Sequence, residues 1–133
     1  MEPSLTDAID IYQSQVEIVS TLWTFFGTVT LAVVGFTIGS DKATHSGTEV
    51  AIIIVGYAAF ALIGNLVALL MAYSDLIQFK ALVEYKLVAL GKDFPQIHFG
   101  VPSVEAVAMF HIGIVVIVCC GIYLYYRSRR GVT

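Results

Sequence analysis

The chain has 133 residues, of which 58% are hydrophobic and only 13% are charged, and its net charge at neutral pH is −3. A soluble domain carries about 25% charged residues, and a chain of this length cannot hide so much apolar surface beneath a polar shell. The composition therefore excludes an ordinary soluble domain, and the shortage of basic residues excludes a nucleic-acid-binding protein.

Charged residues are absent from three long stretches, which lie between Glu17 and Asp41, between Glu49 and Asp75, and between Glu105 and Arg127. Each has roughly 20–25 residues, the length of a helix that crosses about 30 Å of hydrocarbon. Backbone polar groups in lipid must pair within their own segment, so these stretches should be helices. The sequence predicts a single all-α domain that spans the membrane three times, at about residues 17–39, 50–74 and 104–126.

The first helix should begin before its membrane span. Ser4 and Asp7 have the spacing of a capping box, which places the helix start near Leu5. Residues 4–16 are then an acidic, amphipathic helical segment outside the membrane. The helix is expected to end at Gly39 and Ser40.

One face of this first span combines threonines with small residues. Thr21, Thr24 and Thr28 recur at helical spacing and are continued by Ala32, Gly35 and Gly39. Such a face favours close helix packing. The alternative is a hydrated path lined by hydroxyl groups in an assembly of several chains. Glu17, at the end of the span, marks the membrane boundary and would form a ring of charge in such an assembly.

The second helix should be the longest. Ser46 and Glu49 form another capping box, and nothing interrupts the helical pattern before Gly91. Beyond Tyr73 the pattern becomes amphipathic, so residues 75–91 are predicted to extend helix 2 outside the membrane. A bend near Asp75, which would lay this segment on the membrane surface, is the alternative.

Asn65 lies near the middle of the second span, where an unpaired amide is unfavourable. Four alanines, Ala58, Ala61, Ala68 and Ala72, share its stripe. We interpret the stripe as a packing surface, within the chain or between copies, on which Asn65 adds a hydrogen bond. Lining of a pore is the competing interpretation.

The third helix should begin at Ser103 as the N-cap. His111 lies about two turns into this span, where a neutral imidazole bonded to a neighbouring helix is expected; a protonation switch is the alternative. The span closes with residues typical of a membrane interface, namely Tyr123, Tyr125, Tyr126, Arg127, Arg129 and Arg130.

Three spans place the N-terminus and residues 75–102 on one side of the membrane and the C-terminus on the other. The three arginines beside the last span favour a cytoplasmic C-terminus, in a bacterial inner membrane or a plasma membrane.

The adjacent Cys119 and Cys120 are expected to be small buried apolar residues.

The sequence carries no H-E-x-x-H, phosphate-loop or G-x-S-x-G motif and no Cys/His pair at metal spacing. No enzyme, metal site or cofactor is therefore predicted.

We expect a homo-oligomeric channel or pore, gated through the segments outside the membrane, whose partners are the lipid bilayer and further copies of the chain. The alternative is a non-conducting accessory or scaffold subunit that binds a larger membrane protein.

Overall fold

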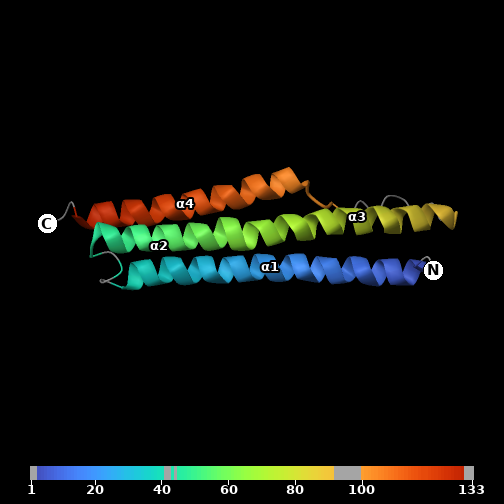
Figure 1. The fold of residues 1–133 in the computed structure, drawn as a ribbon, viewed down its shortest axis with the longest axis horizontal. Coiled ribbons are helices and arrows are strands. Elements are labelled where there is room, and N and C mark those ends of the chain that lie inside the picture. The colour runs from blue at the N-terminus through green and yellow to red at the C-terminus, as the bar shows by residue number, and fades with distance from the viewer. Residues whose placement is uncertain (1–2, 41–42, 44, 92–99, 131–133) are drawn as a thin grey trace.

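The computed structural model describes residues 3–40, 43, 45–91 and 100–130. They form an all-α fold, as the sequence predicts. The described elements in chain order are α1 (Leu5–Gly39), α2 (Gly47–Ala59), the π-helix η1 (Phe60–Leu66), α3 (Val67–Ala89) and α4 (Val104–Arg130). The segments α2, η1 and α3 form one continuous rod, so the described residues form three long helices (Figure 1).

The ends of the helices follow the predicted capping signals. Ser4 and Ser46 each accept a hydrogen bond from the backbone N–H three residues later, and the carboxylates of Asp7 and Glu49 accept from the two serine N–H groups. These bonds to Ser4 hold the pKa of Asp7 below its ordinary value. Beyond α3, Gly91 adopts a φ of 63°, a left-handed conformation that glycine tolerates best.

The long rod of α2, η1 and α3 lies antiparallel to both α1 and α4 (Figure 1). The helix α3 is unbroken through Asp75, so the alternative of a bend that would separate the segment after this residue is not adopted. The N-terminus and the end of α3 lie at one end of the molecule, and the C-terminus lies at the other. Because α4 begins only partway along α3, the first turns of α1 and the last turns of α3 project beyond it as a pair.

The core consists of two clusters along the bundle. One joins Val19 of α1 to Leu69, Tyr73 and Leu76 of α3 and to Val107 of α4. The other cluster lies nearer the C-terminal end and contains Phe26, Tyr57, Ala61 and Val115. Both clusters draw on all three rods, so each rod buries one stripe and exposes the rest.

Large apolar side chains cover much of the outer surface, among them Leu31, Ile63, Met109 and Ile117. In the described part of the chain, three helices are long and apolar enough to cross a membrane, and they contain the three predicted spans. Exposed aliphatic side chains on such helices are what a hydrocarbon environment favours, because lipid solvates them as well as a core does. The chain is a small multi-pass membrane protein.

The π-helix η1 changes which alanines face inward. Ala61 packs against Phe26 and Val115, and Ala72 packs against Val19 and Val107. Ala58 and Ala68 are only partly buried, however, while their neighbours Tyr57 and Leu69 take the fully buried positions. A π-turn holds one residue more than an α-turn, which moves the inward stripe by one position. The predicted alanine stripe therefore faces α1 and α4 only in part, and it does so within one chain.

Candidate functional site

Two polar side chains are buried at the middle of the bundle, on different helices. Asn65 of η1 is 3% exposed and His111 of α4 is fully buried. The amide Nδ2 of Asn65 donates to the backbone carbonyl of Leu22 in α1, at 3.2 Å. The imidazole Nε2 of His111 lies 3.1 Å from the backbone carbonyl oxygen of Ala61 in η1. These two contacts tie the central rod to both of its neighbours.

Aromatic rings surround the imidazole of His111. Its ring centroid lies 4.0 Å from that of Phe26 and 5.7 Å from that of Trp23. Because a carbonyl oxygen can only accept, the contact with Ala61 assigns the hydrogen of the neutral ring to Nε2. The other ring nitrogen, Nδ1, and the amide oxygen of Asn65 are buried without a hydrogen-bond partner in the described part of the chain. The protonation switch at His111 stays a prediction.

The acceptor of the imidazole contact lies in the π-helix η1. Hydrogen bonds in a π-helix join residues five apart, whereas those of an α-helix join residues four apart. Ala61 lies within this segment and carries no large side chain, so the imidazole reaches its carbonyl oxygen.

Two further polar contacts between helices were not predicted from the sequence. Trp23 donates its indole N–H to the hydroxyl of Tyr73 at 3.2 Å, and the hydroxyls of Thr30 and Tyr57 lie 3.0 Å apart. Buried tryptophan and tyrosine usually find a partner for their polar atom. The presence of Trp23 and Tyr57 inside predicted spans is therefore a signal that could have indicated these pairs.

The threonine face of α1 points away from the bundle. Thr21, Thr24 and Thr28 are all exposed. Thr21 lies two positions after the buried Val19, and Thr28 lies two positions after the buried Phe26. Two positions are about 200° around a helix, so these threonines lie nearly opposite the core. Thr24 and Thr28 donate their hydroxyl hydrogens to the backbone carbonyls of Ser20 and Thr24, at 2.9 and 2.8 Å. Their oxygen lone pairs remain on the outer surface.

The same outward line continues toward the N-terminus with acidic and polar side chains. Asp10, Ser14 and Glu17 are exposed and precede Thr21 at helical spacing. In the other direction the line continues with the exposed small residues Ala32, Gly35 and Gly39. We call this line of exposed residues the outer face of α1; it consists of Asp10, Ser14, Glu17, Thr21, Thr24, Thr28, Ala32, Gly35 and Gly39.

The aromatic and basic residues at the end of α4 lie beside the end of α1. The hydroxyl of Tyr125 donates to the carbonyl of Ile38 at 3.3 Å, which satisfies one of the last carbonyls of α1. The guanidinium carbon of Arg129 lies 5.2 Å from the ring centroid of Tyr125, and that of Arg130 lies 4.9 Å from that of Tyr126. Tyr123 and Arg127 are exposed, also at this end of α4. The role of these six residues as interfacial anchors stays a prediction.

Among the described residues, no three His, Cys, Asp or Glu side chains converge as they would around a metal ion. The expectation that both cysteines are buried is wrong, because Cys119 is only partly buried and Cys120 is exposed on the outer surface of α4, and neither forms a disulfide. Comparison of the chain with family models, with curated proteins and with solved structures finds no match.

Proposed function

We propose that this protein is a homo-oligomeric cation channel, in which the outer faces of α1 from several copies line the conducting path. The observation that carries the proposal is the exposed line of hydroxyl and carboxylate groups that runs along α1 from Asp10 to Thr28. Within the span, the hydroxyl hydrogens of Thr24 and Thr28 are bonded to α1 itself. Their oxygen lone pairs would find no donor in hydrocarbon but would be solvated in a water-filled path.

A conducting path needs more than one chain. The centre of the three-helix bundle is filled by buried side chains that include Phe26, Leu69 and His111. Close packing of this kind leaves no continuous route for water through a single copy. The outer face of α1 lies opposite that packed centre, so an assembly around it would leave the core of each chain unchanged.

The chemistry of the outer face favours cations. Asp10 and Glu17 would form rings of carboxylates at the end where the helices project, and α1 contains no lysine or arginine. Rings of acidic side chains select cations in channels, and hydroxyl oxygens can replace part of an ion's hydration shell. Toward the other end, Ala32, Gly35 and Gly39 would let neighbouring α1 helices approach closely and narrow the path.

Gating would act through the projecting pair of helices. α1 is continuous from this projection into the proposed path, and its N-terminal part, as far as Val19, packs along α3. A tilt of the pair caused by a bound partner would therefore reorient the residues that line the path.

Ion flux into liposomes tests the proposal. The wild-type protein should release potassium from loaded vesicles, and Glu17→Gln should lower the ratio of cation to anion flux severalfold. Thr24→Val should reduce flux without changing the size of the assembly, because an apolar ring favours dewetting. Glu84→Gln is the matched control, since Glu84 is an exposed carboxylate on the projecting part of α3.

A protein that is monomeric in nanodiscs and gives no ion flux in liposomes would overturn the proposed channel. That outcome would instead support the accessory subunit, whose outer face of α1 would contact a larger membrane protein.

A further inference from the structure

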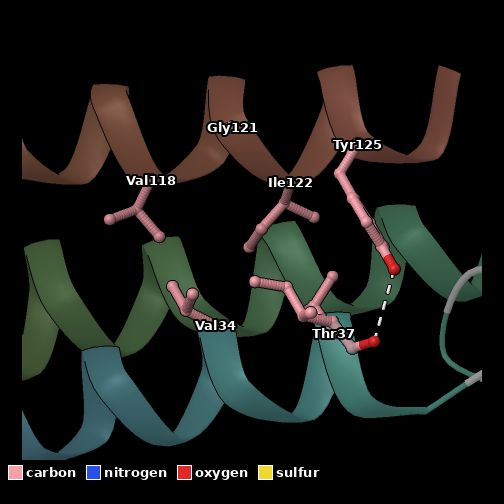
Figure 2. Close-up of a pocket in the computed structure, with 7 residues that line it drawn as sticks. Val34, Thr37, Val118, Gly121, Ile122 and Tyr125 are labelled. Carbon is pink, nitrogen blue, oxygen red and sulfur yellow. Dashed lines mark hydrogen bonds between the residues drawn. The ribbon is translucent and has the colours of Figure 1, made fainter. Parts of the chain in front are cut away.

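A cavity of about 290 Å³ lies between α1 and α4, near the ends of both helices. Val34, Thr37 and Ile38 line it from α1, and Val118, Ile122 and Tyr125 line it from α4 (Figure 2). Gly121 completes the lining on α4. We call this cavity the α1–α4 groove.

The groove is apolar and open to the outside of the bundle. Thr37 and Ile122 are buried and form its floor, whereas Ile38 at its edge is 56% exposed. The hydroxyl of Thr37 donates to the carbonyl of Val33 at 2.8 Å, so its hydrogen needs no partner from a ligand. A Cβ placed on Gly121 would meet no described atom within 4 Å, which leaves a gap in the wall. In a membrane such an opening faces hydrocarbon chains.

The cationic side chain of Arg129 lies near the C-terminal end of the groove. Val118, Ile122, Tyr125 and Arg129 follow one another at spacings of three or four residues, so they share one face of α4. The guanidinium of Arg129 packs on the ring of Tyr125, which itself lines the groove. Arg129 therefore lies one helical turn beyond the groove, at the level where the membrane surface is expected.

We propose that the α1–α4 groove binds an anionic phospholipid, with one acyl chain along Val118 and Ile122 and the phosphate at Arg129. The apolar floor fits the chain, and its opening faces the lipid from which the chain would enter. Guanidinium groups bind phosphate through paired hydrogen bonds, and the guanidinium of Arg129 packs on the ring of Tyr125 at the end of the groove. The proposal commits to a lipid of the membrane rather than to a second copy of the chain.

Native mass spectrometry of the whole chain in detergent, with added phosphatidylglycerol or phosphatidylcholine, tests the headgroup contact. The wild type should retain phosphatidylglycerol more tightly, and Arg129→Gln should reduce that preference about fivefold, the effect of one basic residue near an anionic group. Arg127→Gln is the matched control, because it removes the same charge from α4 about 200° away from Tyr125 around the helix. Equal losses in the two variants would indicate diffuse attraction by the tail and would overturn the site.

The groove itself is tested by filling it. Gly121→Leu should lower the retention of both lipids, because the new side chain occupies the space that the acyl chain needs. Gly113→Leu is the control, since a Cβ there also meets no described atom within 4 Å and Gly113 does not line the groove. Unchanged lipid retention in Gly121→Leu would contradict the proposal and would leave the proposed channel untouched, because the outer face of α1 is not altered. Dissociation of the assembly in this variant would also contradict the proposal, because copies of the chain would then contact one another through the groove.

Discussion

Asn65 and His111 are each bonded through one nitrogen and leave a second polar atom without a partner in the described chain. Hydrogen bonds between membrane helices contribute about 0.6 kcal/mol on average, less than an isolated amide in hydrocarbon would suggest. A bond accompanied by an unpaired atom should contribute at the lower end of the range, because the unpaired atom offsets part of the gain. The aromatic packing around His111 is therefore expected to matter more than its hydrogen bond.

Replacing Asn65 with leucine should destabilise the bundle by only about 0.5 kcal/mol. The change removes the bond to Leu22, but it also removes the unpaired amide oxygen, and leucine keeps the same branching and the same number of side-chain heavy atoms. Reversible unfolding in bicelles would measure the difference. Asn65→Ala is the comparison, because it adds a cavity and should cost more. A loss above about 2 kcal/mol for the leucine variant would mean that the amide makes stronger contacts than the one to Leu22.

At His111, the ring and the hydrogen bond can be separated by two substitutions. His111→Phe keeps a ring beside Phe26 and should cost about 0.5–1.5 kcal/mol for the lost bond to Ala61. His111→Ala also creates a cavity and should cost about 2–4 kcal/mol. The same unfolding measurement checks both values. Equal losses would show that the bond, and not the ring, holds α4 against η1.

Among the elements, η1 determines the register of the central rod. It accommodates one more residue per turn than an α-helix, so the helix on either side keeps its buried stripe in line with α1 and α4. Tyr57 on one side and Leu69 on the other both reach the core as a result. Loss of one residue within η1 should then convert it to a regular α-helix without turning the flanking helices.

Two single-residue deletions test this role. Deletion of Ile63, which is 74% exposed within η1, should leave Tyr57 and Leu69 buried and remove mainly the contact between His111 and Ala61. Deletion of Val55, 66% exposed in α2, should rotate the preceding turns by about 100° and bury the wrong residues. Thermal unfolding in micelles should rank the Ile63 deletion as clearly the more stable. The reverse order would show that η1 does not set the register.

The helices and their ends could be predicted because their signals are local. Charge-free runs of sufficient length indicate spans, and a serine followed three residues later by an acid indicates a helix start, as at Ser4 and Ser46. The π-turn has no such signal, because residues 60–66 are apolar or small apart from Asn65 and contain no proline. Facing lipid and facing core both favour apolar residues, so the pattern did not reveal that Leu69 rather than Ala68 is buried. The candidate faces were recognised, but their partners depend on tertiary packing.

At the scale of the whole molecule, three rods of unequal length give two different ends. One end carries the projecting turns of α1 and α3, and the other carries the arginine-rich end of α4 (Figure 1). An odd number of spans would put these ends on opposite sides of the membrane. The orientation with the C-terminus in the cytoplasm stays a prediction from the basic residues.

Cysteine labelling with an impermeant reagent tests this arrangement. In a background without Cys119 and Cys120, single cysteines at Thr6 and Val88 should react from the same side of sealed vesicles. A cysteine at Ser128 should react only from the other side, and all three positions are exposed in the structure. Reaction of positions 6 and 128 from one side would rule out three spans. The labelled side also identifies the cytoplasmic end.

The projecting pair of helices also sets an electrostatic distance. From Asp75, where the charge-free run ends, to the end of α3 at Ala89 the helix rises about 20 Å. The Debye length at physiological ionic strength is about 8 Å and the headgroup layer is about 6 Å deep, so the tip lies more than one screening length from the anionic lipid surface. A protein that binds at the tip would therefore encounter the charges of Lys86 and its neighbours with those of the membrane largely screened. Lipid composition should consequently affect the end of α4 and leave binding at the tip of α3 nearly unchanged.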